Sequence, residues 1–368
     1  MRIKLAYDRA FPLTAVVWAM ALLLLPPIAC SGSAAPSAGG SGGDEAISAA
    51  AQGDLIARLP ADATTVGMID FAALRNTPAY EFLRNEGAAV GDPGEFEDLI
   101  AETGIDPDTD LHRIAFMSSQ WFSEDMGDAS GAVVVATFDR DKVLESIAEQ
   151  PTEEYGGYTL YSSDGWHRGE DEGDDEGDGE GDDGDRDDGY LTILDDNTVA
   201  FGGSRTIRAI IDVANGAASA RTNTRLMGLL EDVDPDSETW FVSAQDALFK
   251  DIAPDSDGPM QQIPIDRIDA MIMSLRLTDG IQVNLRGRTG ESSDAKLLGD
   301  SLNGMLAFGK MMIQGSDPDV FAILDRGITA GSSGRDVTLR ANLSIADLET
   351  LSNYARTTFE ESMGEPGE

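Results

Sequence analysis

The sequence offers few side chains suited to the common catalytic chemistries. Its 368 residues include two histidines, His112 and His167, and a single cysteine, Cys30. Two histidines cannot build a zinc site without the help of carboxylates, and one thiol excludes a disulfide within the chain. We expect His112 to be structural, at the start of a strand, and His167 to be an exposed residue beside an acidic segment.

Nucleophile and phosphate-loop motifs are missing from the sequence. No Gly-x-Ser-x-Gly stands at a strand-to-helix turn, and no Gly-x-x-x-x-Gly-Lys is present. Ser204, in Gly-Gly-Ser-Arg, comes closest and is better explained as the N-cap of a helix. With 67 Asp and Glu in the chain, pairs of carboxylates suited to glycoside hydrolysis arise by chance. We therefore expect no catalytic residue and no enzyme, with a carboxylate-based hydrolase as the least favoured alternative.

An acidic, glycine-rich segment is the most conspicuous candidate site. Residues 169–189 contain 13 Asp and Glu and one Arg, and they interrupt a predicted hairpin. Such a segment cannot bury a core, so the default interpretation is a solvated loop and no cofactor. The alternative is calcium, because carboxylates and flexible glycines supply hard oxygen ligands in calcium loops. The candidate ligands are Asp174, Glu176, Asp178 and Asp185, with Gly179 at the position where such loops turn sharply.

The N-terminal segment carries the clearest signal for cellular address. Residues 11–30 form an apolar run that ends on Cys30, with Arg2, Lys4 and Arg9 before it. A basic start, a short apolar core and a small residue at the break are typical of an export signal. Residues 31–52, rich in Ser, Gly and Ala, are expected to be a flexible tether.

With Ala29 directly before Cys30, the segment resembles a bacterial lipoprotein signal, although Pro27 stands where that family usually has Leu. The resemblance implies that Cys30 is the lipid-attachment residue and anchors the protein to a membrane. Ser31 in the next position implies the outer membrane if the cell has two membranes. A plain signal peptide and an uncleaved membrane anchor remain the alternatives, because a span needs about 20 apolar residues. All three interpretations place the protein outside the cytoplasm.

Charge narrows the range of partners. The chain has 67 acidic and 26 basic residues, a formal net charge of −41. Such a surface repels nucleic-acid phosphates, so we expect no nucleic-acid binding. Apolar residues make up 41% of the chain, which is enough for a sizeable core.

Hydrophobic periodicity and turn residues predict an α+β fold with an internal repeat. Residues 64–69 read as a strand before a helix at 71–83, and 239–242 as a strand before another helix. Hairpins are expected at 268–277 with 281–288 and at 327–330 with 337–343. Long helices follow from Ser292 and Ser344, and the methionines of the first, Met305, Met311 and Met312, are expected to fill the core.

Both halves read strand–helix, hairpin–helix, hairpin–helix. We therefore expect two similar halves, each an antiparallel sheet with helices on one face. This paired layout is similar to that of uncharacterised exported bacterial proteins. The expected divisions are a signal segment (1–29), the lipidated Cys30 with its tether (30–52), a first half with the acidic insertion (53–220), a second half (221–362) and a disordered tail (363–368).

The function predicted from the sequence is that of a membrane-anchored extracytoplasmic lipoprotein. Its role would be non-catalytic, in binding, assembly or envelope maintenance, with protein partners in the envelope. The principal alternative is a calcium-dependent adhesion or sensing module that uses the acidic segment.

Overall fold

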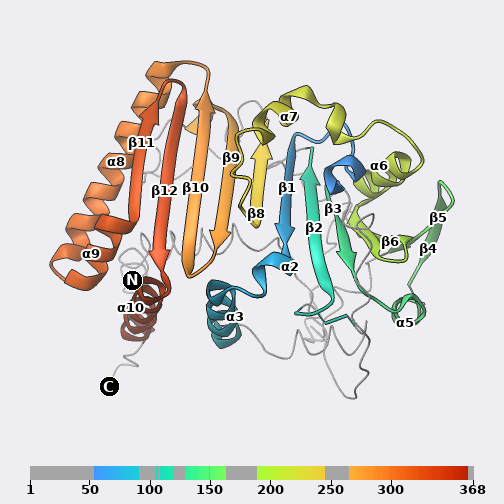
Figure 1. Cartoon of the computed structure of the whole chain (residues 1–368), viewed down its shortest axis with the longest axis horizontal. Helices are drawn as coiled ribbons and strands as arrows, with labels where there is room; N and C mark the ends of the chain where they lie inside the picture. The colour runs from blue at the N-terminus through green and yellow to red at the C-terminus, as the bar shows by residue number, and fades with distance from the viewer. Residues whose placement is uncertain are drawn as a thin grey trace, which may run out of the picture.

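The computed structural model describes residues 54–90, 105–106, 108–119, 129–148, 150–162, 189–244 and 265–363. Within them the chain forms a mixed α+β fold around one 12-stranded antiparallel sheet, shown in Figure 1. The strand order is β11-β12-β10-β9-β8-β1-β2-β3-β7-β6-β5-β4. The strand bounds are β1 Thr65–Asp70, β2 Leu111–Ser118, β3 Ser130–Ala136, β4 Thr152–Tyr155, β5 Tyr158–Ser162, β6 Gly189–Asp195, β7 Thr198–Gly203, β8 Thr239–Ser243, β9 Ile268–Leu277, β10 Gly280–Thr289, β11 Ile328–Ser333 and β12 Asp336–Ser344.

Helices cover both faces of this sheet. Their bounds are α2 Phe71–Leu74, α3 Pro78–Val90, α5 Arg140–Ser146, α6 Ser204–Ala214, α7 Thr224–Leu230, α8 Ser292–Gln314, α9 Pro318–Gly327 and α10 Ile345–Met363. Short 3-10 turns occur at η1 Leu55–Arg58, η2 Ala220–Thr222 and η4 Ile265–Arg267.

One continuous sheet replaces the two sheets that the sequence predicted. The join lies between β1 and β8, which pair antiparallel from Thr65 opposite Ser243 to Ile69 opposite Thr239. The hydroxyls of Thr65 and Ser243 are hydrogen-bonded at 2.8 Å in a buried position. Both strands are short and apolar, and each buries its edge against the other rather than ending a separate sheet.

The prediction that the helices lie on one face is wrong. Val133 of β3 packs with Ile207 of α6, whereas its neighbour Val134 packs with Val143 of α5. Successive strand residues point to opposite sides, so α6 and α5 lie on opposite faces. We call these sides the α6 face and the α8 face, since α8 lies on the same side as α5.

Shared side-chain contacts assign the remaining helices to these faces. Leu226 of α7 belongs to the core cluster of α6. Phe116 links the α5 cluster to the cluster that contains Ala79 of α3 and has Leu348 of α10 packed against it. Leu298 of α8 packs with Val337 of β12 on that second side. Strands with apolar residues on both sides need helices packed against each face of the sheet.

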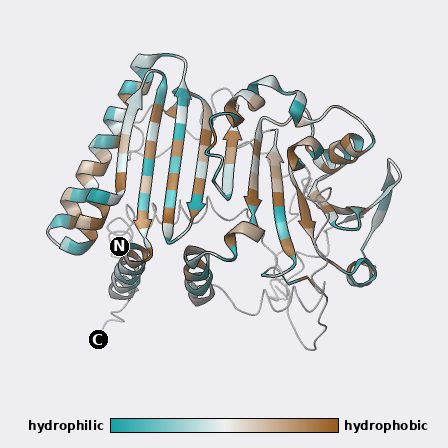
Figure 2. Cartoon of the chain, viewed as in Figure 1, coloured by the Kyte–Doolittle hydropathy of each residue, from teal (hydrophilic) through white to brown (hydrophobic). Residues whose placement is uncertain are grey.

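The strands beyond β9 differ from the rest in having a polar α6 face. Figure 2 shows hydrophilic and hydrophobic bands alternating along β10 and β12. The hydrophobic residues point to the α8 face, beneath α8, α9 and α10. In the described part of the chain, no helix packs on the α6 face of β10, β12 and β11. The side chains on this face of β10 and β12 are half-buried or exposed.

Helix ends show where local sequence signals held. Asp139 caps α5, accepting hydrogen bonds from the backbone N–H groups of Asp141 and Lys142. At α10, the backbone N–H of Ser344 donates to Asp347 and that of Asp347 donates to the Ser344 hydroxyl. This reciprocal pair is a capping box, at the helix start that the sequence predicted near Ser344.

Two local predictions about helices are wrong. Ser204 is the first residue of α6 rather than its cap, which is Gly203, and no side chain caps this end. The single helix expected over 71–83 is two helices. The first, α2, ends at Leu74, and the second, α3, begins at Pro78 after Thr77. The Thr77 hydroxyl accepts from the backbone N–H of Tyr80, and proline favours the first position of a helix.

The methionines of α8 are also misassigned by the sequence. Met305, Met311 and Met312 are exposed rather than buried in the core. The inner side of α8 is instead formed by Ala295, Leu298, Gly299 and Ile313. Because apolar residues surround most of this helix, its periodicity did not indicate which side meets the sheet.

Candidate functional site

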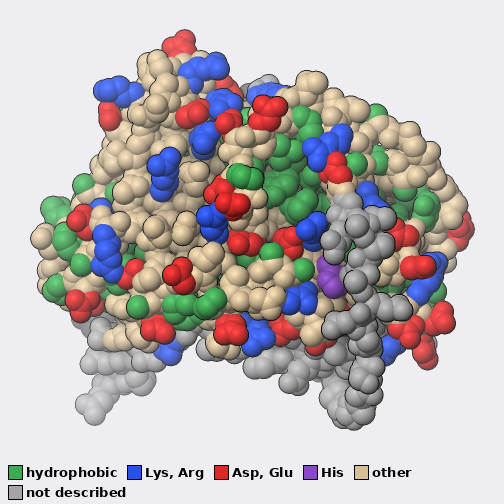
Figure 3. Space-filling view, viewed as in Figure 1, with side chains coloured by type: hydrophobic (Ala, Val, Ile, Leu, Met, Phe, Trp, Pro, Cys, Tyr) green, Lys and Arg blue, Asp and Glu red, His purple; other side chains and the backbone are tan. Residues whose placement is uncertain are grey.

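Among the residues that the structure describes, arginines are concentrated on the open part of the α6 face. They come from several elements that are far apart in the sequence: Arg225, Arg276, Arg286, Arg288, Arg335 and Arg340. Figure 3 shows Lys and Arg side chains gathered over this part of the sheet. In a chain with only 26 basic residues against 67 acidic ones, six arginines on one face of a few strands are a marked concentration of basic side chains.

The alternation of β10 and the adjacent turn explain how these side chains meet. Arg286 and Arg288 are two residues apart on β10 and therefore lie on the same face. Arg335 belongs to the two-residue turn between β11 and β12, where Gly334 has a φ of 59°. A glycine adopts this left-handed conformation without strain, and the tight turn holds Arg335 beside the end of β10.

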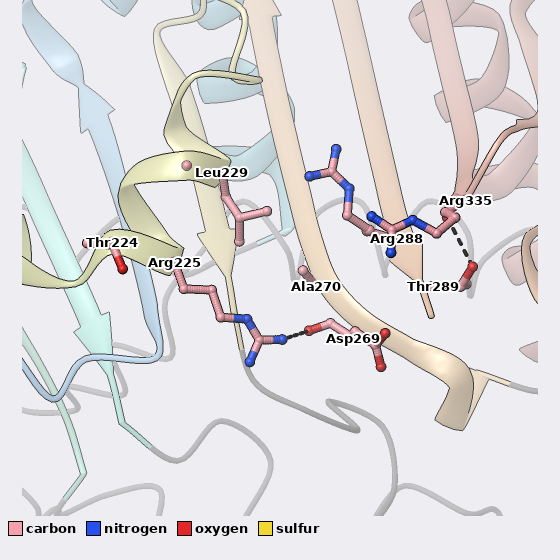
Figure 4. A pocket seen from close by; sticks show the side chains of 9 residues that line it. Thr224, Arg225, Leu229, Asp269, Ala270, Arg288, Thr289 and Arg335 are labelled. Atoms are coloured by element: carbon pink, nitrogen blue, oxygen red, sulfur yellow. Dashed lines mark hydrogen bonds between the residues drawn. The ribbon is translucent and has the colours of Figure 1, made fainter. Parts of the chain in front are cut away.

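Three of the arginines line an open hollow of about 350 Å³. They are Arg225 from α7, Arg288 from β10 and Arg335 from the β11–β12 turn. The rest of the lining is small or polar: Thr224, Gly228, Leu229, Asp269, Ala270 and Thr289. In Figure 4 the side chain of Arg335 extends toward Arg288, while Arg225 reaches across to the backbone of Asp269. We call this group the arginine site.

Carboxylates fix the floor of the arginine site. Arg288 donates to Asp336, its partner across the β10–β12 ladder, at 3.0 Å and to Asp232 at 3.0 Å. Arg286 donates to the other oxygen of Asp232 at 3.1 Å. The hydrogen bond that Arg288 donates to Asp336 raises the pKa of Arg288 above its ordinary value. Burial opposes this rise, and the hydrogen bond that Arg288 donates to Asp232 adds to it. Arg288 is thus a permanent, positioned cation.

The two arginines at the rim are held differently. Arg225 Nη2 donates to the backbone oxygen of Asp269 at 2.9 Å, and this hydrogen bond orients the guanidinium. The backbone oxygen of Arg335 accepts from Thr289 at 2.9 and 3.0 Å, so its main chain is fixed. The Arg335 guanidinium makes no ion pair with the residues described here. The Arg335 side chain can therefore turn toward an incoming anion.

This arrangement is suited to recognition of an oxyanion. A guanidinium presents N–H donors in a planar fork that matches a carboxylate or phosphate. Two rim forks above a fixed third cation could contact several oxygens of one ligand group. No group of three or more His, Cys, Asp or Glu in the described ranges is arranged to hold a metal ion.

A second hollow of about 300 Å³ lies between η1, α6 and the strands β5 and β6. Arg58 and Asp195 line it and form an ion pair at 2.9 Å. Burial raises the pKa of Asp195, but hydrogen bonds from Arg58, Thr198 and Asn197 outweigh this and lower it. Because its one cation and one anion neutralise each other, this hollow has less capacity for a charged ligand.

The structure describes only part of what the sequence singled out. His112 lies on β2 as expected, with Nε2 2.9 Å from the hydroxyl of Thr137. The lipid-attachment residue Cys30, the histidine His167 and the four candidate calcium ligands lie outside the described residues. No described helix is both long and apolar enough to cross a membrane.

The arginine site itself was missed by sequence reasoning. Its members are single arginines between residues 225 and 340, with no motif that connects them. The only available signal was the presence of Arg286 and Arg288 on one face of a predicted strand, a spacing that usually indicates a solvated surface.

The chain matches no protein-family model, and no curated protein sequence or solved structure is significantly similar to it. What the arginine site binds therefore has to be inferred from its own chemistry.

Proposed function

We propose that this protein is an exported, lipid-anchored and non-catalytic binding protein of the cell envelope. Its ligand would carry a carboxylate or phosphate group and dock on the arginine site. The observation that supports binding is the convergence of Arg225, Arg288 and Arg335, from three separate elements, on one hollow. Convergent cations on an acidic surface create a local potential that concentrates anions.

The absence of a binding partner for the Arg335 guanidinium within the described residues favours a ligand role over a structural one. A structural arginine is normally tied to a carboxylate, as Arg288 is to Asp336 at 3.0 Å. Binding without catalysis is proposed because the sequence contains no recognisable nucleophile motif or phosphate loop and only two histidines.

Oxyanion binding is tested by titrating the full-length protein in detergent with inorganic phosphate and with citrate. We expect saturable binding that weakens with salt, because the interaction is between charges. The double variant Arg225→Ala/Arg335→Ala should bind at least about tenfold more weakly, which corresponds to about 1.4 kcal/mol. Arg84→Ala is the control, since Arg84 is an exposed arginine outside the arginine site, where it pairs with Asp108. Equal binding by the double variant and the control would refute the site.

The cellular address is a separate part of the proposal. It is supported by the basic residues, the apolar run and the position of Cys30 in the sequence. Mass spectrometry of the mature N-terminus should find acylated Cys30, and Cys30→Ser should move the protein from the membrane fraction to the soluble one. An unmodified Cys30 would remove the lipid anchor and leave only an extracytoplasmic address.

We also propose that the sheet consists of two related halves. Outward from the central join, one side runs β1-β2-β3-β7-β6 and the other β8-β9-β10-β12-β11. The same connections therefore occur in the same order on both sides, with β4 and β5 added to the first. The last helices differ, because α6 and α10 pack on opposite faces.

A further inference from the structure

The helix α8 carries an unusual concentration of exposed apolar side chains. The large hydrophobic residues that are mainly exposed in the described part of the chain are all on this helix. They are Leu297 (50% exposed), Met305 (38%), Phe308 (59%), Met311 (64%) and Met312 (51%). Figure 3 shows hydrophobic side chains at the edge of the molecule over this region. A contiguous apolar patch of this kind marks an interaction surface.

The patch forms a stripe on one flank of α8. Leu297, Ser301, Gly304, Phe308 and Met311 recur at intervals of three and four residues, which places them in a row along the helix. Lys310 lies on the opposite flank, where it contacts Asp325 of α9 at 3.1 Å. Lys310 is also the only charged residue between 301 and 316. The five stripe residues are uncharged, although the chain as a whole carries −41. Asp300 lies beside the stripe and is paired with Lys296 at 3.3 Å.

Large and small residues alternate along this stripe in a self-complementary order. Consider a second α8 that lies antiparallel across the stripe, with the two-fold axis at the level of residue 306 along the helix. Phe308 then faces Gly304 of the other copy. In the same register, Met311 faces Ser301 and Leu297 faces Gly315. A side chain added at Gly304 or Gly315 would meet nothing within 4 Å in one chain. Each large residue thus finds an open position on the other helix, as isologous interfaces require.

The neighbouring edge of the sheet also favours a second copy of this chain as the partner of α8. β11 is an edge strand that pairs only with β12, and its residues are Ile-Thr-Ala-Gly-Ser-Ser, without charge or proline. The other edge strand, β4, carries Glu153 and Glu154. Charges protect edge strands from pairing, so β11 lacks the protection that β4 has.

We propose that two copies of this chain form a symmetric dimer through α8, with the β11 edges beside the contact. A protein partner explains both features better than a bilayer, because lipid cannot satisfy the unpaired backbone groups of an edge strand. Charges elsewhere on two acidic copies are screened beyond about 8 Å at physiological salt. α8 lies on the opposite face of the sheet from the arginine site, so the dimer leaves that site accessible.

Cross-linking in native membranes tests the dimer with the full-length protein. Met305→Cys lies near the proposed two-fold axis and should give a dimer band with a short bis-maleimide. Lys296→Cys, which is exposed on the other flank, should not. The unsubstituted chain, whose only cysteine is Cys30, measures the background.

A second substitution distinguishes a dimer of this chain from contact of α8 with another protein or with lipid. Adding Phe308→Asp to Met305→Cys should abolish the dimer band, and Phe308→Ala should weaken it. Circular dichroism of these variants should be unchanged, because Phe308 is exposed in one copy. No cross-link at Met305→Cys above background, or a cross-link that Phe308→Asp leaves intact, would overturn the proposal. Protection of the Met305→Cys thiol from maleimide only when lipid is present would overturn it in favour of a membrane contact.

Discussion

His112 shows how one side chain can couple this fold to pH. It lies on β2 near Arg75 and two acidic residues, and its ring contacts Thr137. Burial, followed by the positive charge of Arg75, lowers the pKa of His112, and Asp110 and Asp70 oppose this only partly. The neutral ring is therefore favoured in the folded protein.

This shift predicts a loss of stability in mild acid. The unfolded chain binds a proton at the ordinary pKa of about 6.5, whereas the folded chain binds it only at lower pH. As the pH falls below that value, the unfolded state takes up more protons and the free energy of unfolding decreases. His112→Asn should remove this part of the pH dependence below about pH 6.5. Urea unfolding of both proteins across this range measures it, and identical slopes would contradict the assignment.

At the residue scale, the sequence predicted local interactions and missed those made across the sheet. The Ser344–Asp347 capping box depends on residues three apart and was readable directly. The arginine site depends on β10 lying beside the β11–β12 turn and on α7 reaching the same edge. Only the strand order brings Arg225 and Arg335 together, and no local pattern encodes it.

Among the elements, the close approach of β1 and β2 depends on a glycine. The ring of Phe116 lies over Gly67, and a Cβ at Gly67 would be 2.1 Å from the ring Cζ. Phe116 also links three apolar clusters of the α8 face, so it has little freedom to move. This contact joins the two strands next to the centre of the sheet.

Gly67→Ala should therefore destabilise the protein by about 1–3 kcal/mol, the usual cost of overpacking. Gly228→Ala is the control, because Gly228 lies within α7 and has nothing within 4 Å of its missing Cβ. Alanine favours a helix over glycine by about 1 kcal/mol, so this variant should be neutral or more stable. Thermal unfolding compares the two, and an equal effect would argue against the Phe116 contact.

The hairpin of β5 and β6 allows a test of the acidic segment. Ser162 and Tyr190 are paired across these strands, so the residues that flank the segment 163–189 are already adjacent. Replacement of the segment by Asn-Gly, a favoured two-residue turn, should leave the sheet folded. Circular dichroism and thermal unfolding check this result.

The same variant tests the calcium alternative. If Asp174, Glu176, Asp178 and Asp185 bind calcium, only the unaltered chain should bind it in a titration. Equal binding by both proteins would rule out these four residues as the ligands.

Predictions of elements held best where turn residues set the boundaries. The β9–β10 hairpin was expected from Asp279-Gly280 and is present. The α8 helix was also expected, but the side that it buries was not, because Leu, Met and Phe occur around most of its surface. Packing against β11 selects the side with small residues such as Gly299, whose missing Cβ would lie 3.0 Å from Ser332.

For the whole molecule, excess negative charge opposes folding. Acidic residues outnumber basic ones by 67 to 26, so like-charge repulsion outweighs the Arg–Asp pairs that the fold contains. The Debye length falls from about 30 Å at 0.01 M salt to about 3 Å at 1 M. We expect the free energy of unfolding to rise over this range, as measured by urea unfolding in NaCl. A decrease would mean that the ion pairs dominate instead.

The join between β1 and β8 has a consequence for the order in which the chain folds. Thr65 and Ser243 are hydrogen-bonded neighbours although 178 residues separate them. A chain that emerges N-terminus first can assemble β1 to β7 while one edge of β1 still waits for β8. Pairings between residues so far apart form slowly, and an unpaired strand edge is a template for aggregation until it is filled. Closure of the β1–β8 join should therefore be the late step of folding, and the interval before it the period in which the chain most needs protection.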